Sequence, residues 1–150
     1  MLLRFVIGFG FVAHGGAKLS RGSDKFAGLL THIGIPFPEF MAWLVTLVEL
    51  FGGVAMILGA FITLLSIPLI IVHLVALTTV HLRHGFSSVN TIGMSPNGPL
   101  FGPPGFEINL LYIAGILVLA TFGSGAASLD NAFVSAVEQR SDETENEARQ

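Results

Sequence analysis

The sequence contains no cysteine among its 150 residues. Without a thiol, the chain cannot carry out thiol–disulfide exchange, offer a thiolate nucleophile, or hold zinc or an iron–sulfur cluster through cysteine. A stand-alone thiol enzyme is therefore excluded. Any sulfur chemistry connected with this chain would have to be performed by a partner.

Charged residues are also scarce, since Asp, Glu, Lys and Arg make up 11% of the chain, against about a quarter in ordinary soluble domains. Hydrophobic residues make up 52%, which indicates an integral membrane protein with one compact membrane domain. The net charge of −3 comes from residues 138–150, where five acids oppose two bases. No basic surface remains that would bind nucleic acid.

Four apolar segments are candidates for membrane helices, at about residues 2–19, 40–60, 61–82 and 106–123. A helix of 20 residues covers about 30 Å, the thickness of the hydrocarbon core of a bilayer. Pro68 lies inside the third segment, and Gly8, Gly52 and Gly53 favour close helix packing. The sequence therefore predicts an all-α membrane protein, a bundle of four transmembrane helices over residues 1–130.

The connections between these segments differ in character. Apolar residues recur at helical spacing between Ser20 and Pro38, which predicts a short helix lying at the membrane interface. The 23 residues from Arg83 to Gly105 are rich in Gly and Pro, and we expect a long third loop that covers one end of the bundle. Residues 131–150 form an acidic tail that we expect to be disordered.

Glu49 is the only ionisable residue between Phe40 and Ala60, and it lies in the middle of this segment. An acid at the centre of a bilayer costs about 2.5–3.5 kcal/mol. We therefore expect Glu49 to point into the bundle, where its partner is either His73, at the same depth of the predicted helical hairpin, or Arg4. In the alternative interpretation, Glu49 is neutral and hydrogen-bonded, and only fixes the packing of the helices.

The five histidines raise the question of a metal or haem site. His81 and His84 are three residues apart, so a helix would place them on one face. However, the sequence contains no Glu-x-x-His pair of the kind that holds a di-iron centre in a helix bundle. A haem with two histidine ligands would need His14 to face His73 or His81. The pattern does not favour a metal or a haem.

Several short blocks combine glycines with polar residues near the predicted helix ends. They are Arg4 with Gly8; His14-Gly15-Gly16-Ala17-Lys18-Leu19; Ile33-Gly34-Ile35-Pro36; Glu49-Leu50-Phe51-Gly52-Gly53 with Leu58-Gly59; His81 with Gly85-Phe86; Gly105-Phe106-Glu107; and Gly123-Ser124-Gly125 with Ser128-Leu129-Asp130. In this order of blocks, over about residues 4–130, the chain resembles the DoxX family of integral membrane proteins.

The resemblance implies a four-helix bundle in the bacterial cytoplasmic membrane. It also implies a subunit of a quinone-linked oxidoreductase that works beside soluble redox proteins. The family-like polar residues, carried over by position, are Arg4, Lys18, Glu49, His81, Glu107 and Asp130. His73 is not part of this family pattern, so a Glu49–His73 pair would be particular to this chain.

These observations lead to the hypothesis of a quinone-interacting membrane subunit. Glu49 would carry protons, Arg4 or Lys18 would balance its charge, and His81 would relay protons toward the third loop. The residues expected to be catalytic are Arg4, Glu49 and His81, and those expected to bind the cofactor are Lys18, His73 and Glu107. Two other functions remain open: a membrane anchor or scaffold for soluble redox enzymes, and a transporter of small lipophiles or ions.

Overall fold

The computed structural model describes residues 1–123, 125 and 128–148, with side chains as far as residue 137 and at 139 and 140. Ser124 of the family-like blocks and the last two residues of the expected tail lie outside this range. The elements are α1 (Leu2–Arg21), α2 (Ser23–His32), α3 (Pro38–Leu58), α4 (Ile62–Ala76), the π-helical turn η1 (Leu77–His81), the 3₁₀ turn η2 (Leu82–His84), β1 (Thr91–Ser95), β2 (Gly98–Phe101), α5 (Glu107–Phe122) and α6 (Leu129–Ala148).

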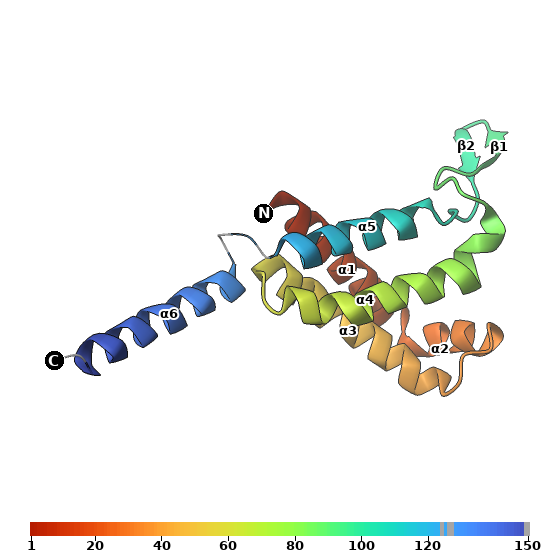
Figure 1. Cartoon of the computed structure of the whole chain (residues 1–150). Coiled ribbons are helices and arrows are strands. Elements are labelled where there is room, and N and C mark those ends of the chain that lie inside the picture. Colours follow the sequence, from red (N-terminus) through yellow and green to blue (C-terminus); the bar gives the residue numbers. More distant parts are fainter. Residues whose placement is uncertain (124, 126–127, 149–150) are drawn as a thin grey trace.

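Helices α1, α3, α4 and α5 run side by side and form the bundle (Figure 1). Within the described residues, three helical stretches are long and apolar enough to cross a membrane: Leu2–Arg21, Pro38–Leu58 and Ile62–His84. Helix α5 is also apolar, but has 16 residues. The prediction of a mostly helical membrane protein is therefore confirmed.

The bundle is apolar on its inside and on its outside. Phe11, Met56 and Leu69 are buried in its core, whereas Phe51 and Leu64 are exposed on its outer surface. Helices that are hydrophobic all round need an apolar environment on every face. The outer surface is thus suited to lipid rather than to water.

Helices α1 and α3 approach each other most closely at two glycines. A Cβ atom added to Gly8 would lie 2.6 Å from the carbonyl oxygen of Gly53, and one added to Gly53 would lie 2.6 Å from the carbonyl oxygen of Gly8. Real Cβ atoms do not come this close to backbone oxygen, so only glycine allows this helix contact. The expected packing role of Gly8 and Gly53 is confirmed.

Asp130 stabilises the short connection between α3 and α4. Its carboxylate accepts hydrogen bonds from the backbone N–H groups of Phe61, at 2.8 Å, and Ile62, at 3.3 Å. These N–H groups begin α4 and have no partner within the helix, so the carboxylate acts as its N-terminal cap. The backbone N–H of Asp130 donates in turn to the carbonyl of Gly59, at 3.0 Å. This family-like acid therefore has a structural role.

The segment between α4 and α5 differs from the irregular loop that the sequence predicted. Strands β1 and β2 pair in an antiparallel hairpin with Ser95 opposite Gly98, and the connecting turn contains Pro96 and Asn97. The hairpin projects away from the end of the bundle instead of covering it (Figure 1). The Asn-Gly step is a hairpin signal that the high glycine and proline content concealed.

The C-terminal part also differs from the expected disordered tail. Helix α6 occupies Leu129–Ala148 and extends away from the bundle at the end opposite the hairpin (Figure 1). Residues such as Ala132, Ala136, Gln139 and Arg140 have high helix propensity, which explains a helix that the charge pattern alone did not indicate.

Candidate functional site

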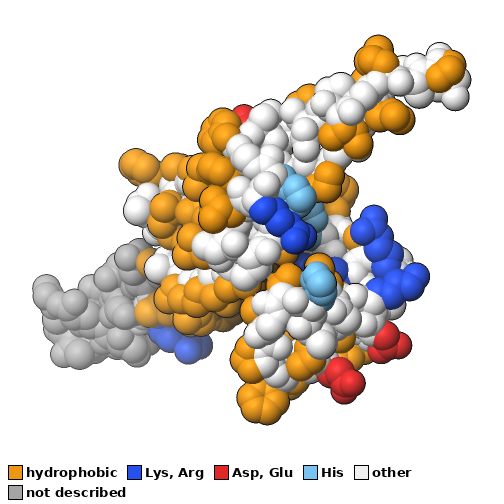
Figure 2. All heavy atoms as spheres, turned by 90° about the vertical axis from the view of Figure 1, so that its right-hand side faces the viewer, with side chains coloured by type: hydrophobic (Ala, Val, Ile, Leu, Met, Phe, Trp, Pro, Cys, Tyr) orange, Lys and Arg blue, Asp and Glu red, His pale blue; other side chains and the backbone are white. Residues whose placement is uncertain are grey.

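A cavity of about 710 Å³ opens among α1, α2, α3, α4 and the start of α5. Most of its wall is apolar, and α2 contributes one side through Phe26, Leu29 and Leu30. Figure 2 looks onto this end of the molecule, where Lys, Arg and His side chains gather between two lobes. The polar residues of the wall are His14, Lys18, Glu49, His73, Thr79, His81, Ser88, Asn109 and Tyr112.

Glu49 forms an ion pair with Lys18 in the wall of this cavity. The Lys18 ammonium donates a hydrogen bond to Oε2 of Glu49, and Glu49 is only 5% exposed. Lys18 also lies over the ring of Phe26, with Nζ 4.7 Å from the ring centre, so α2 helps to hold the cation. A paired carboxylate inside the bundle offsets the cost of placing an acid in a membrane helix. Glu49 therefore points inward, as expected.

The partner of Glu49 is neither His73, which was expected at the same depth of the helical hairpin, nor Arg4, the alternative from the first helix. Among the described residues, its hydrogen bond comes from Lys18 and not from His73 or Arg4. Lys18 was expected only as a possible charge-balancing residue, on equal terms with Arg4. Lys18 reaches Glu49 because α1 and α3 are antiparallel neighbours, which places the last turn of α1 near the middle of α3.

Arg4 lies near the opposite end of α1. It is buried, and its Nε donates a hydrogen bond of 3.1 Å to the carbonyl of Ile57, in the last turn of α3. A cation at this position interacts favourably with the helix C-terminus. Since 14 residues of helix separate Arg4 from Lys18, about 21 Å lies between them. The structure does not bring Arg4 to Glu49.

His73 belongs to a second polar cluster, at the α4–α5 contact. Nδ2 of Asn109 lies 3.2 Å from Nδ1 of His73, and the Tyr112 ring stacks on the imidazole with 4.7 Å between ring centres. Phe11 meets the imidazole edge-on at 5.1 Å. The cluster holds the imidazole rigidly, with one face against an aromatic ring and one edge against an amide.

The remaining predicted residues lie around the cavity or at its rim. His81 ends η1, and its Nδ1 is 3.0 Å from the carbonyl oxygen of Pro104. The carboxylate of Glu107 accepts a hydrogen bond of 2.9 Å from the backbone N–H of Ser88, and so ties α5 to the loop that precedes β1. His81 faces the same cavity as Glu49, whereas Glu107 stabilises the loop beside it.

The histidines do not gather into a metal site. No group of three or more His, Cys, Asp or Glu side chains that could hold a metal ion occurs in the part of the chain that the structure describes. His14 lies near Tyr112, with 5.9 Å between their ring centres, and His73 stacks on the same Tyr112 and meets Phe11 edge-on. The two imidazoles thus contact aromatic rings.

Sequence reasoning missed two members of the site, Asn109 and Tyr112. Asn109 is buried in an apolar segment, and Tyr112 follows one turn later on the same face of α5. An amide inside a predicted membrane helix is a polar group that needs a partner, and this signal could have identified it.

The long apolar helices and the polar groups enclosed among them define an integral membrane protein with several apolar helices. The family model of DoxX matches residues 1–82, which is more than half of the chain, so this protein belongs to the DoxX family. The matched region contains Lys18, Glu49, His73 and His81. No curated protein and no solved structure matches the chain.

Proposed function

We propose that this protein is a membrane subunit that binds a lipid-soluble quinone in the cavity and exchanges protons with it. The observation that carries the proposal is the composition of the cavity wall: extensive apolar surface with a few polar groups at fixed positions. Ligand sites in proteins have volumes of about 300–1,000 Å³ and this same combination of surfaces. The apolar wall suits an isoprenoid tail, and the polar groups suit the ring oxygens.

Within this proposal, the residues around the cavity have distinct roles. The Lys18–Glu49 pair exchanges protons with the ring oxygens, and His81 passes protons to the rim. Conversion of a quinone to a quinol takes up two electrons and two protons. A soluble redox protein would supply the electrons, and the chain supplies the path for the protons. Arg4 stabilises the packing of α1 against α3, and Glu107 stabilises the loop beside the cavity.

The membrane arrangement is part of the proposal. Helix α5, at about 1.5 Å per residue, covers about 24 Å, so a modest local thinning of the bilayer allows it to be the fourth spanning helix. Four spans place α2 and the β-hairpin on one side, and the N-terminus and α6 on the other. The bacterial cytoplasmic membrane, in which quinones circulate, is the location that fits this function.

Filling the cavity tests the proposal. Val72 lines the cavity and Leu64 faces outward on the same helix, so Val72→Trp and Leu64→Trp form a matched pair. Binding of a decyl-substituted benzoquinone to protein in nanodiscs should weaken at least tenfold for Val72→Trp and stay within twofold for Leu64→Trp. Equal binding by both variants, or no binding by the unchanged protein, would refute the proposal.

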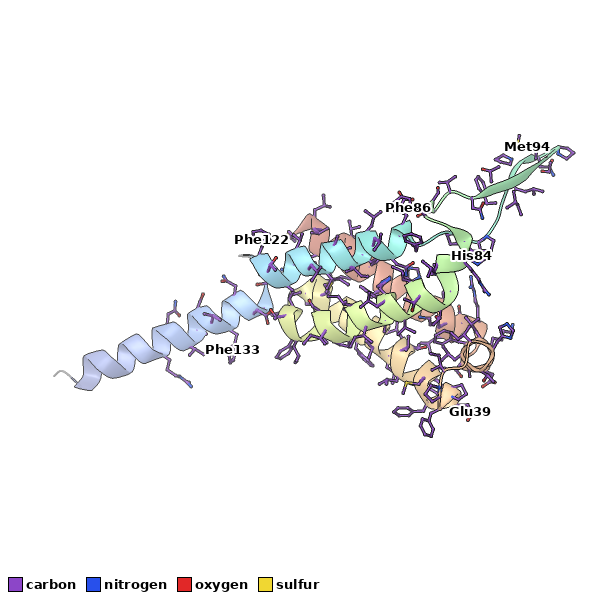
Figure 3. All side chains as sticks on the ribbon, turned by 45° about the vertical axis from the view of Figure 1, so that its right-hand side comes forward. Glu39, His84, Phe86, Met94, Phe122 and Phe133 are labelled. Carbon is purple, nitrogen blue, oxygen red and sulfur yellow. The ribbon has the colours of Figure 1, made fainter. Side chains whose placement is uncertain are left out.

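The role of the acid is tested by measuring quinone reduction with the same nanodisc preparation. Glu49→Gln removes the buried carboxylate, and Glu39→Gln removes an exposed carboxylate at the start of the same helix, far from the bundle centre (Figure 3). With a soluble redox protein as electron donor, quinone reduction should slow at least tenfold for Glu49→Gln only. Unchanged reduction by Glu49→Gln would exclude this carboxylate as the proton carrier.

The β-hairpin favours a second function, the docking of a soluble redox protein. Ile92, Met94 and Phe101 are exposed on it, and Met94 lies at its projecting end (Figure 3). The chain carries no charged residue between Arg83 and Glu107. Exposed apolar side chains on a projecting element are typical of interaction sites. Replacing Ile92 and Met94 by Ser should abolish co-purification of the electron donor and leave quinone binding intact.

A further inference from the structure

Two buried polar atoms in the described part of the chain, Nε2 of His73 and Oδ1 of Asn109, have no hydrogen-bond partner. Both residues line the same cavity. Side-chain exposure is 8% for His73 and 2% for Asn109. Buried polar atoms are nearly always paired in native proteins, so a concentration of such atoms in one cavity wall points to a ligand that pairs with them.

The hydrogen bond between Asn109 and His73 determines what the two unpaired atoms can do. Nδ2 of Asn109 faces two acceptors of His73, Nδ1 at 3.2 Å and the backbone carbonyl oxygen at 3.5 Å. Because the backbone carbonyl can only accept, the donating amide nitrogen of Asn109 faces His73. Nδ1 of His73 then accepts this hydrogen bond, so the imidazole is neutral and carries its proton on Nε2. Consequently Nε2 of His73 is a donor, and Oδ1 of Asn109 is only an acceptor.

These two atoms discriminate between the oxidation states of a quinone. A carbonyl oxygen can accept a hydrogen bond from Nε2 of His73, but it has no hydrogen to donate to Oδ1 of Asn109. A hydroxyl group accepts and donates. We propose that the His73–Asn109 pair makes this cavity selective for the hydroxyl-bearing, reduced form of its ligand, a quinol, over the carbonyl form. This inference rests on the proposed quinone function and adds the preferred redox form.

The surroundings of the pair fit a planar ring ligand. The Tyr112 ring stacks on His73, and His14 lies beside Tyr112, so aromatic surfaces of this cavity lie next to the imidazole. The Lys18–Glu49 pair lies in the same cavity wall, where it can pass on the two protons that a quinone takes up when the redox partner reduces it to the quinol. A quinol formed in the cavity would thus have hydrogen-bond partners and a route for its protons in a single site.

The test compares decyl-benzoquinone with its quinol, which have nearly the same size and tail. Binding to protein in nanodiscs is measured under nitrogen and corrected for the partitioning of each compound into protein-free nanodiscs. The absence of cysteine excludes addition of the quinone to a protein thiol. We expect the quinol to bind about tenfold more tightly, a difference of about 1.4 kcal/mol.

Asn109→Leu removes the acceptor and should reduce this preference to within twofold, mainly by weakening quinol binding. Thr121→Val is the matched control, because Thr121 is an exposed polar residue of the same helix whose hydroxyl donates to the backbone carbonyls of Leu117 and Val118, one turn earlier. It should keep the tenfold preference. If Asn109→Leu does not fold, the comparison of the two ligands on the unchanged protein decides the question.

The outcomes separate the two proposals. Equal binding of quinol and quinone by the unchanged protein, or a preference that persists in Asn109→Leu, would overturn the selectivity and leave the quinone site standing. Failure of both compounds to bind would overturn the proposed function and the selectivity together. A preference that disappears only in Asn109→Leu supports the inference.

Discussion

At the scale of single residues, the ion pair between Lys18 and Glu49 is the central feature. Both side chains belong to membrane-length helices, and the carboxylate is almost fully buried. In such a place each charge is stable only beside the other, because an unpaired buried charge costs several kcal/mol. The pair therefore links the fold to the proposed proton exchange.

The pair predicts an asymmetric effect of single and double substitutions. Lys18→Met leaves the Glu49 carboxylate without its cation and should destabilise the protein by about 3–5 kcal/mol. The double variant Lys18→Met, Glu49→Gln should recover most of this loss, since the uncompensated charge is gone. Denaturant unfolding in mixed micelles measures the free energy of unfolding of both variants. Lys25→Met is the control, because Lys25 is an exposed lysine of α2. A loss no larger than that of the control would contradict the assigned pairing.

The sequence predicted the inward direction of Glu49, but not its partner. Its depth in an apolar segment was sufficient for the direction, because a carboxylate that faces lipid near the bilayer centre is costly whichever helices are neighbours. The choice among Lys18, Arg4 and His73 depends on which helices are neighbours and how they run. Which helices are neighbours becomes known only from the tertiary packing, here of α1 against α3, and cannot be read from a single sequence.

At the scale of elements, the contact of α1 with α3 determines the position of the cavity. The two glycines at the closest approach, Gly8 and Gly53, allow the backbones to meet. Beyond this contact, the last turn of α1 places Lys18 beside Glu49. Helix α2 follows and forms the next wall of the cavity. A change in the distance between these helices should therefore change the distance between Lys18 and Glu49.

A methyl group at the glycine contact should separate the helices. Gly8→Ala places Cβ against the backbone oxygen of Gly53, which cannot move away as a side chain could, so we expect a loss of about 1–3 kcal/mol. Gly16→Ala is the matched control on the same helix, because its added Cβ meets no atom within 4 Å. Thermal unfolding of the two variants in detergent compares them. Equal stability of Gly8→Ala and Gly16→Ala would show that the helices do not approach closely there.

The elements that the sequence did not predict have weak local signals. The hairpin β1–β2 contains nine strand residues with glycine and proline among them, and the alternation of apolar and polar residues in β1 does not continue into β2. For α6, the high density of acids suggested disorder. Most of these acids are Glu, however, which is a good helix former. In contrast, the long helices were predicted well, since a membrane span requires a long apolar run.

At the scale of the whole molecule, the arrangement of the spans is the main expectation. With four spanning helices, α2 and the hairpin lie on one side of the membrane, and α6 on the other. The absence of cysteine makes a labelling experiment simple, because a single introduced cysteine is the only thiol. Cysteine at Lys25 and at Asn97 should react with an impermeant maleimide from the same side, and cysteine at Ser135 from the opposite side. Labelling of all three from one side would exclude the four-span arrangement.

The helical membrane domain as a whole could be predicted from composition and from the apolar segments. The cavity could not, because it is formed by residues of six separate elements, α1 to α4, η1 and α5, and of the loops between them. Asn109 shows the difference clearly. Its burial and its contact with His73 arise only when α4 and α5 pack together.

The central claim is that the ring of a lipid-soluble quinone occupies the cavity near the Lys18–Glu49 pair. Photolabelling with an azido-substituted decyl-benzoquinone, followed by mass spectrometry of the peptides, tests this claim most directly. We predict labels in residues 26–35 and 68–81, which contribute to the cavity wall, and loss of these labels when unlabelled quinone is added. Labels spread over the outer, lipid-facing surface, for example at Phe51 and Leu64, without competition by unlabelled quinone, would contradict it.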